Sequence, residues 1–162
     1  MTFALASRLG LLLSERQVKC AVAESCTGGG LAAAITDIAG SSCWFDRGFV
    51  TYSNEAKQEM LGVPLSVITT EGAVSQAVVC AMARGVIMHS HAAVGVAISG
   101  IAGPTGGSRE KPVGTVWIAF SDASHKTQAQ KYVFEGDRGA IRQQAIHAGL
   151  EGLIRLLAAS DL

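Results

Sequence analysis

A short apolar run over residues 18–23 ends in a cluster of nucleophile-capable side chains and then in glycines, Glu24-Ser25-Cys26-Thr27-Gly28-Gly29-Gly30. The apolar run predicts a short buried strand, and the glycines predict a turn through which a ligand can approach the backbone. The helix expected to follow offers unpaired N–H groups at its N-terminus to a negative charge. The segment therefore predicts a reactive site at the end of a buried strand.

The chain has 162 residues, 49% of them hydrophobic and 16% charged, which is enough for one domain, 1–162, with a substantial core. Its 13 basic and 13 acidic residues cancel, so no net charge favours nucleic acid or an anionic membrane as a partner. No apolar run approaches the roughly 20 residues of a membrane span. The first eight residues lack the basic and then apolar pattern of a secretory signal.

The cysteines are Cys20, Cys26, Cys43 and Cys80, and no two of them form a C-x-x-C pair. Scattered cysteines indicate free thiols in a reducing compartment, so we expect a cytoplasmic protein. The histidines do not have zinc-ligand spacing, and neither a metal nor a cofactor is expected.

Helical spacing and capping residues predict helices over 2–15, 28–39, 55–61, 76–89 and 139–159, with Asn54, Ser75 and Asp137 as N-caps of the last three. Strands are expected over 18–23, from about 47 to 52, and over 92–99, 113–121 and 126–134. The third strand is apolar at nearly every position, which predicts a central strand buried on both faces. Five strands among helices, the last two forming a hairpin, predict an α/β fold: a three-layer α/β/α sandwich around a mixed sheet.

A second group of candidate residues follows the strand that ends at about residue 52. Lys57 falls in the first turn of the next helix, where the helix dipole and burial both disfavour an ammonium. A neutral Lys57 can take the proton of a serine hydroxyl, and Tyr52 can orient or relay it. The alternative is a solvated Lys57 and a half-buried Tyr52 with no part in catalysis.

A third group lies in the glycine-rich loop Ser99-Gly100-Ile101-Ala102-Gly103-Pro104-Thr105-Gly106-Gly107. It is neither a Walker motif nor a dinucleotide fingerprint. Backbone N–H groups of such a loop can cradle a phosphate or ribose, although a surface crossover is an equal alternative. The guanidinium of Arg138 suits a phosphate or carboxylate, unless it is simply a surface arginine.

The residues alone leave two roles open. Ser25, Cys26 and Thr27 are rival nucleophiles that the local pattern does not separate. Glu24 can act as an acid or base, or it can fix the turn by accepting hydrogen bonds from backbone N–H groups.

Together, three long motifs resemble the CinA C-terminal domain family, whose members include bacterial nicotinamide mononucleotide deamidases. They are Ala-Glu-Ser-Cys-Thr-Gly-Gly at 23–29; Ile-Ala-Gly-Ser-Ser at 38–42 with Gly-Phe-Val-Thr-Tyr-Ser-Asn-Glu-Ala-Lys at 48–57; and Ser-Gly-Ile-Ala-Gly-Pro at 99–104 with Lys-Pro-Val-Gly-Thr-Val at 111–116. They occur in the family's order and span nearly the whole chain. Many members also carry a larger N-terminal domain, which these motifs do not match, so the resemblance implies the deamidase activity alone.

The resemblance implies that the chain hydrolyses the carboxamide of nicotinamide mononucleotide to nicotinic acid mononucleotide and ammonia, in pyridine nucleotide salvage. It implies Ser25 as nucleophile, Lys57 as base and Tyr52 as their assistant, within a homo-oligomer. Supporting positions carried over from the family are Ser42, Ser99 and Arg138; the Thr27, Gly28, Gly29, Gly100 and Gly103 backbone is also expected to bind substrate. The alternatives are a non-catalytic nucleotide-binding module and an amidohydrolase acting on a different amide.

Overall fold

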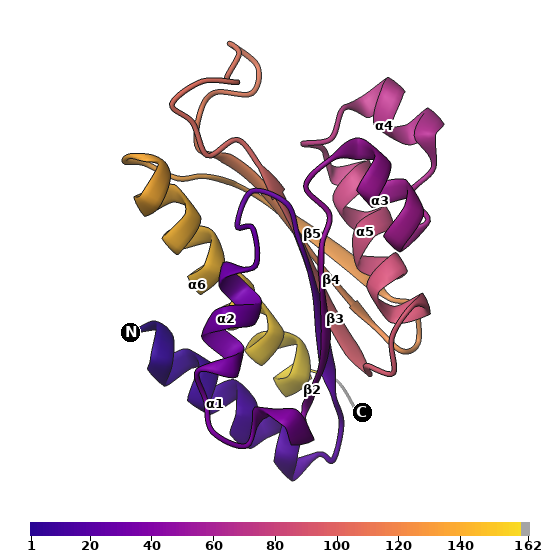
Figure 1. Ribbon diagram of the computed structural model, residues 1–162, viewed down its shortest axis with the longest axis vertical. Coiled ribbons are helices and arrows are strands. Elements are labelled where there is room, and N and C mark those ends of the chain that lie inside the picture. The colour runs from indigo at the N-terminus through magenta and orange to yellow at the C-terminus, as the bar shows by residue number, and fades with distance from the viewer. Residues whose placement is uncertain (160–162) are drawn as a thin grey trace.

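A five-stranded mixed sheet lies at the centre of the computed structural model, which describes residues 1–159 (Figure 1). Its strands lie in the order β2-β1-β3-β4-β5. Their bounds are β1 Cys20–Glu24, β2 Phe45–Val50, β3 Val94–Gly100, β4 Thr115–Asp122 and β5 Thr127–Val133. β1 runs parallel to β2 and β3, whereas β4 pairs antiparallel with β3 and β5. The predicted mixed sheet, its terminal hairpin and the central position of β3 are confirmed.

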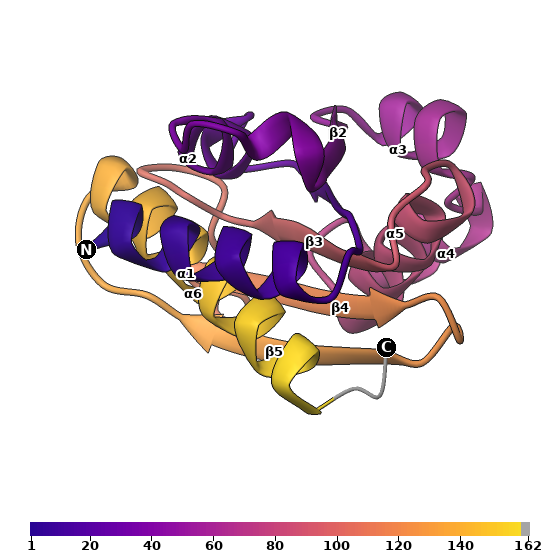
Figure 2. The ribbon, with the colours of Figure 1, turned by 90° about the horizontal axis from the view of Figure 1, so that it is seen from below.

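Helices cover both faces of the sheet and make the three layers. One face carries α1 Thr2–Glu15, α2 Gly30–Thr36 and α6 Arg138–Ala159, and the other carries α3 Asn54–Leu61, α4 Leu65–Glu71 and α5 Gln76–Met88 (Figures 1 and 2). A short 3₁₀ helix, Ser41–Cys43, precedes β2. Each face has its own cluster of buried apolar side chains. No helix within residues 1–159 combines the length and apolar character needed to cross a bilayer.

The face under α5 is built from small side chains. Ala23, Ala97, Ala119 and Ala129 are paired in register across β1, β3, β4 and β5. Alanines project little from the pleated surface, so the apolar side of α5, with Met82 among its fully buried residues, packs directly on this row. Because α5 packs this closely on the sheet, α5 and the helix packed against it, α3, lie close to β1.

Most predicted elements are confirmed within a few residues, and α1 has the predicted bounds. Ser75 and Asp137 cap α5 and α6 as expected, because Ser75 Oγ accepts from the N–H of Val78 and Asp137 Oδ1 from that of Ala140. α4 was not predicted, because its sequence is rich in β-branched residues that disfavour a helix in isolation. Its Ile68 is buried among the residues under α5, and this packing stabilises the helix.

The parallel arrangement of β2, β1 and β3 gathers their carboxyl ends at one edge of the sheet. Glu24 at the end of β1 is in register with Val50 of β2 and Ile98 of β3. The segments that leave these strands carry all three groups of candidate residues. Ligands of open α/β sheets bind at such edges, so the topology itself assembles the candidate site.

The close contact of α3 with α5 leads to a stability prediction. A methyl group at Gly85 of α5 would lie 2.3 Å from the backbone oxygen of Leu61, at the end of α3. We expect Gly85→Ala to lower the free energy of unfolding by about 1–3 kcal/mol, because backbone must move to admit the methyl group. Gly139→Ala on α6 is the control, since its nearest neighbour would lie at 3.4 Å. Urea denaturation measures both; equal stability of the two variants would contradict this account of the packing.

Candidate active site

Glu24 organises the turn that follows β1. Its side chain is fully buried, and its two carboxylate oxygens accept hydrogen bonds from the backbone N–H groups of Gly29, Leu31 and Ala32 at 3.1, 3.0 and 2.8 Å. A carboxylate at a helix N-terminus satisfies donors that have no partner within the helix. Of the two roles left open by the sequence, the structure therefore supports the one in which Glu24 fixes the turn.

Lys57 is buried where α3 begins. The N-cap of α3 is Ser53, whose Oγ accepts from the N–H of Ala56 at 3.0 Å, so the prediction of Asn54 as cap was wrong by one residue. Asn54 is instead the first residue of the helix, because the serine hydroxyl one position earlier reaches the free N–H. Lys57 remains at the start of the helix, and its side chain is only 1% exposed.

The Lys57 amine meets Ser25 at the carboxyl end of β1. Its Nζ lies 3.1 Å from Ser25 Oγ, 2.9 Å from the backbone oxygen of Thr51 and 3.4 Å from that of Tyr52. Burial lowers the pKa of Lys57 below its ordinary 10.5, opposed by a smaller effect of Cys26. Within residues 1–159 no carboxylate pairs with this amine to offset the loss of water. The solvated Lys57 considered from the sequence is therefore excluded.

The other candidate nucleophiles are poorly placed. Burial raises the pKa of the Cys26 thiol to about 11, which keeps it protonated at neutral pH. Thr27 is fully buried, and its Oγ1 has no hydrogen-bond partner among residues 1–159. Ser25 is half-buried and has an amine within hydrogen-bond distance. The geometry thus favours Ser25 among the three.

A pocket of about 200 Å³ opens beside this pair. It is formed by the turn after β1, the link from β2 to α3, the link from α4 to α5, the end of β3 and the start of α6. Its lining residues are Ser25, Cys26, Tyr52, Asn54, Lys57, Ala73, Val74, Ser99, Gly100, Ala102 and Arg138.

Arg138 and Tyr52 form one wall of the pocket. Arg138 donates from Nη1 to the backbone oxygen of Gly103 at 2.9 Å and from Nη2 to Tyr52 Oη at 3.1 Å. The Tyr52 side chain is 61% exposed, and only its backbone oxygen reaches Lys57. The phenol is thus held by Arg138, and no hydrogen bond joins it to Ser25 or Lys57.

Ser99 and two glycines at the end of β3 and in the loop after it make close contacts within the protein. Ser99 is buried, and its hydroxyl donates to the backbone oxygen of Ala73 at 2.8 Å. A methyl group at Gly100 would lie 2.6 Å from Val116, and one at Gly103, which has a φ of +73°, would lie 2.4 Å from Val113. These glycines are required by close packing of protein on protein, whereas the sequence suggested an approach by ligand.

Five expected positions lie outside the pocket lining: Thr27, Gly28, Gly29, Ser42 and Gly103. Gly28 and Gly29 have φ values of +57° and +95° within the turn, and their N–H groups already donate to Ser25 O and to Glu24. Ser42 lies in the 3₁₀ helix before β2. The first residue of β2, Phe45, pairs with Cys20, which is at the end of β1 farthest from Ser25. Within one chain the structure therefore does not bring Ser42 to Ser25.

Arg142 was missed by the sequence analysis. It lies on α6 and donates from Nε to the backbone oxygen of Cys26 at 3.1 Å and from Nη2 to that of Thr27 at 2.9 Å. Its spacing of four residues from Arg138 puts both guanidinium groups on one helix face, and this is the signal that could have indicated it.

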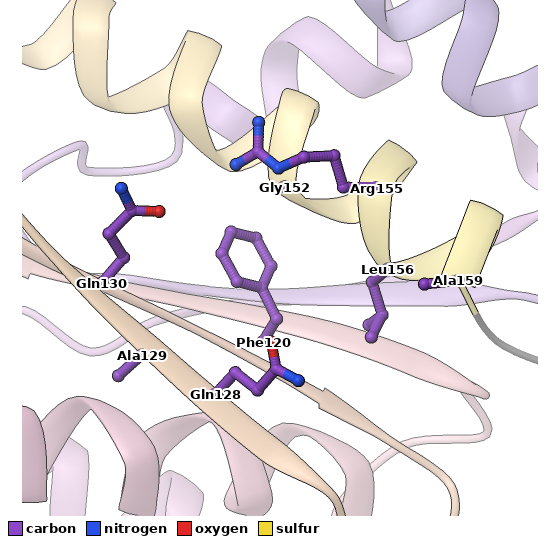
Figure 3. Close-up of a pocket in the computed structure, with 8 residues that line it drawn as sticks. All are labelled: Phe120, Gln128, Ala129, Gln130, Gly152, Arg155, Leu156 and Ala159. Atoms are coloured by element: carbon purple, nitrogen blue, oxygen red, sulfur yellow. The ribbon is translucent and has the colours of Figure 1, made fainter.

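A second pocket, of about 300 Å³, lies between β4, β5 and the end of α6 (Figure 3). Phe120, Gln128, Gln130 and Arg155 lie along it, and its lining contains neither a serine or cysteine nor a lysine. The four cysteines are free thiols. Residues 1–159 contain no group of three or more His, Cys, Asp or Glu side chains placed to hold a metal ion. The pocket between β4, β5 and α6 thus offers no serine or cysteine nucleophile, whereas the site beside Ser25 joins a hydroxyl to a buried amine and is the candidate.

Comparison with known proteins agrees with the three motifs. The model of the CinA C-terminal domain matches residues 2–157. The nicotinamide-nucleotide amidohydrolase PncC of Escherichia coli K12 is 52% identical over 149 residues, which cover 92% of this chain and 90% of that protein. The protein of the same name from Pseudomonas putida is 52% identical over 152 residues, 94% of each chain.

A solved structure gives the same result at the level of the fold. The crystal structure of the competence/damage inducible protein CihA from Agrobacterium tumefaciens superposes with a TM-score of 0.94 at 44% sequence identity, over 96% of this chain and 94% of that one. With the family model covering nearly all described residues, the chain belongs to the CinA C-terminal domain family.

Proposed function

We propose that this chain is a nicotinamide-nucleotide amidohydrolase, which converts nicotinamide mononucleotide to nicotinic acid mononucleotide and ammonia through an acyl-enzyme on Ser25. The observation that carries the proposal is the buried Lys57 amine, 3.1 Å from Ser25 Oγ and lowered in pKa. The names of the relatives at about 52% identity support the substrate. Free cysteines support a cytoplasmic location, and family resemblance alone supports a homo-oligomer in pyridine nucleotide salvage.

The three oxygens around Lys57 Nζ, those of Ser25, Thr51 and Tyr52, fit a neutral amine as well as the three N–H donors of an ammonium, and burial disfavours the ammonium. A neutral –NH₂ group has two N–H donors and one lone pair. The backbone oxygens of Thr51 and Tyr52 provide two acceptors, which leaves the lone pair for the hydroxyl proton of Ser25. An ammonium would have no lone pair and would remain buried without a carboxylate, which is unfavourable. Burial thus shifts the amine towards the protonation state that general-base catalysis needs.

In the first half-reaction Ser25 Oγ forms a bond to the carboxamide carbon while its proton moves to Lys57 Nζ. Of the N–H groups at 26–30, those of residues 28, 29 and 30 donate to Ser25 O, Glu24 and Thr27 O. Those of Cys26 and Thr27 have no acceptor within residues 1–159, so we assign them to the oxyanion. The C–N bond then breaks, and ammonia leaves with the proton from Lys57.

In the second half-reaction a water molecule attacks the ester carbon and gives a proton to Lys57. The Ser25–acyl bond breaks, Lys57 returns the proton to Ser25, and nicotinic acid mononucleotide is released. Tyr52 and Arg138 act in this scheme as a pocket wall. Arg138 uses two of its five N–H donors on Gly103 and Tyr52, and those that remain suit the 5′-phosphate.

Ammonia release from nicotinamide mononucleotide tests the proposal. We expect Ser25→Ala and Lys57→Met each to lower kcat by about 10³-fold or more, because one removes the nucleophile and the other the base. Cys26→Ala is the matched control and should retain turnover. Loss of turnover in Cys26→Ala with retention in Ser25→Ala would move the nucleophile to the thiol. Tight binding without turnover would support a nucleotide-binding module, and turnover of another amide alone would support a different amidohydrolase.

The pH profile tests the role of Lys57. The neutral amine is the active form, so kcat/KM should rise with pH as Lys57 loses its proton. Since burial lowers this pKa below 10.5, the rise should level off below that pH. Initial rates across the alkaline range measure it. A rate that falls as this group deprotonates would show that the ammonium is required and would refute the base assignment.

A further inference from the structure

The turn that carries Ser25 is hydrogen-bonded to a side chain that is distant in the sequence. Arg142 donates to two consecutive backbone oxygens of this turn, those of Cys26 and Thr27, from 116 and 115 residues away. The other hydrogen bonds to carbonyls of this turn are local: Gly28 N–H donates to Ser25 O, and Gly30 N–H to Thr27 O. Arg142 therefore supplies the one charged contact to the carbonyls of the described turn, and such contacts are stronger than neutral ones.

The side from which Arg142 approaches the Cys26 carbonyl determines the direction of the neighbouring N–H group, that of Thr27. The Cys26 carbonyl and the Thr27 N–H belong to one planar trans peptide and point in opposite directions. Arg142 approaches from α6, on the face of the sheet covered by α1, α2 and α6, whereas Lys57 approaches Ser25 from α3 on the other face. A Cys26 carbonyl turned towards α6 therefore leaves the Thr27 N–H directed away from α6, to the side on which Lys57 meets Ser25.

We infer that Arg142 is a positioning residue that aims the Thr27 N–H at the oxyanion. The inference rests on the proposed acyl transfer. It implies that the two N–H donors to the oxyanion, those of Cys26 and Thr27, are oriented by different contacts. The N–H of Cys26 is oriented by a backbone bond, because its own peptide carbonyl, that of Ser25, accepts from Gly28. The N–H of Thr27 is oriented by a guanidinium, which also polarises the peptide and strengthens its N–H as a donor.

Loss of the Arg142 side chain is therefore expected to affect turnover and not substrate binding. Charge develops on the oxygen only as Ser25 attacks, so a misdirected Thr27 N–H weakens the transition state more than the bound substrate. Complete removal of one oxyanion donor costs about 10²–10³-fold in kcat. Loss of its orientation should cost less, about 10- to 100-fold.

Steady-state kinetics with nicotinamide mononucleotide test this expectation. For Arg142→Gln we expect kcat to fall about 10- to 100-fold and KM to change by less than about threefold, as is typical of an interaction made only in the transition state. In Arg142→Ala, added guanidinium ion should restore part of kcat. Arg155→Gln is the matched control on the same helix, since Arg155 lies on the surface 3.9 Å from Glu151, and its kinetics should equal those of the unmodified chain.

Amide hydrogen exchange separates this inference from the proposed function. In Arg142→Gln the amides of Gly28 and Gly30 should exchange faster, and in Arg155→Gln they should not, whatever the substrate. If the unmodified chain releases no ammonia from the nucleotide, the proposed function fails, and faster exchange still supports the grip of Arg142 on the turn. Unchanged exchange overturns the inference, as does a raised KM with unchanged kcat. Should the Gln variant not fold, Arg142→Lys must show the lower kcat and unaltered KM, or the inference falls.

Discussion

The burial of one amine against one hydroxyl is the constraint on which the site depends. Removing an ammonium from water is costly, and Lys57 has no carboxylate among residues 1–159 to offset this cost. The fold offers it the backbone oxygens of Thr51 and Tyr52, which satisfy the two donors of the neutral form. Burial thus shifts the amine towards the neutral form, which can accept the proton of Ser25. A structural requirement, that buried polar groups be paired, and a catalytic one, that the base be uncharged, are met by the same contacts.

The sheet topology supplies the rest of the geometry. Parallel pairing of β1 with β2 and β3 brings three carboxyl ends together, so that the nucleophile turn, the start of α3 and the glycine-rich loop emerge side by side. The row of alanines under α5 brings that helix and its neighbour α3 close to the sheet, and with them Lys57. The buried Glu24 holds the turn by its backbone N–H groups, and Arg142 holds it by its carbonyls. The turn is therefore fixed through both its N–H groups and its carbonyls before any substrate arrives, which is the preorganisation that oxyanion stabilisation requires.

Where a structural feature depends mainly on neighbours in the chain, the pattern of residues predicted most of it. Ser75 and Asp137 cap their helices as expected, because capping is a contact across three residues. The apolar run of β3 predicted a central strand, because a strand buried on both faces is apolar at nearly every position. The predicted cap of α3 was wrong by one residue, since Ser53 and Asn54 are both good caps and only the geometry of the link from β2 selects between them.

The sequence by itself determined the α/β class, the strand–turn–helix that presents Ser25, and membership of a family, because these follow from local periodicity and from continuous motifs. Tertiary structure alone decided that Lys57 contacts Ser25 across 32 positions and that Cys26 is a buried, protonated thiol. It also decided that Tyr52 is bonded to Arg138 and that Arg142 is bonded to the turn after β1. Ser42, in contrast, lies at the other end of the sheet. The physical reason is that proximity and burial of residues distant in the chain are set by how helices pack on the sheet, and hydrophobic periodicity shows only which face of a helix packs, not which side chains then meet.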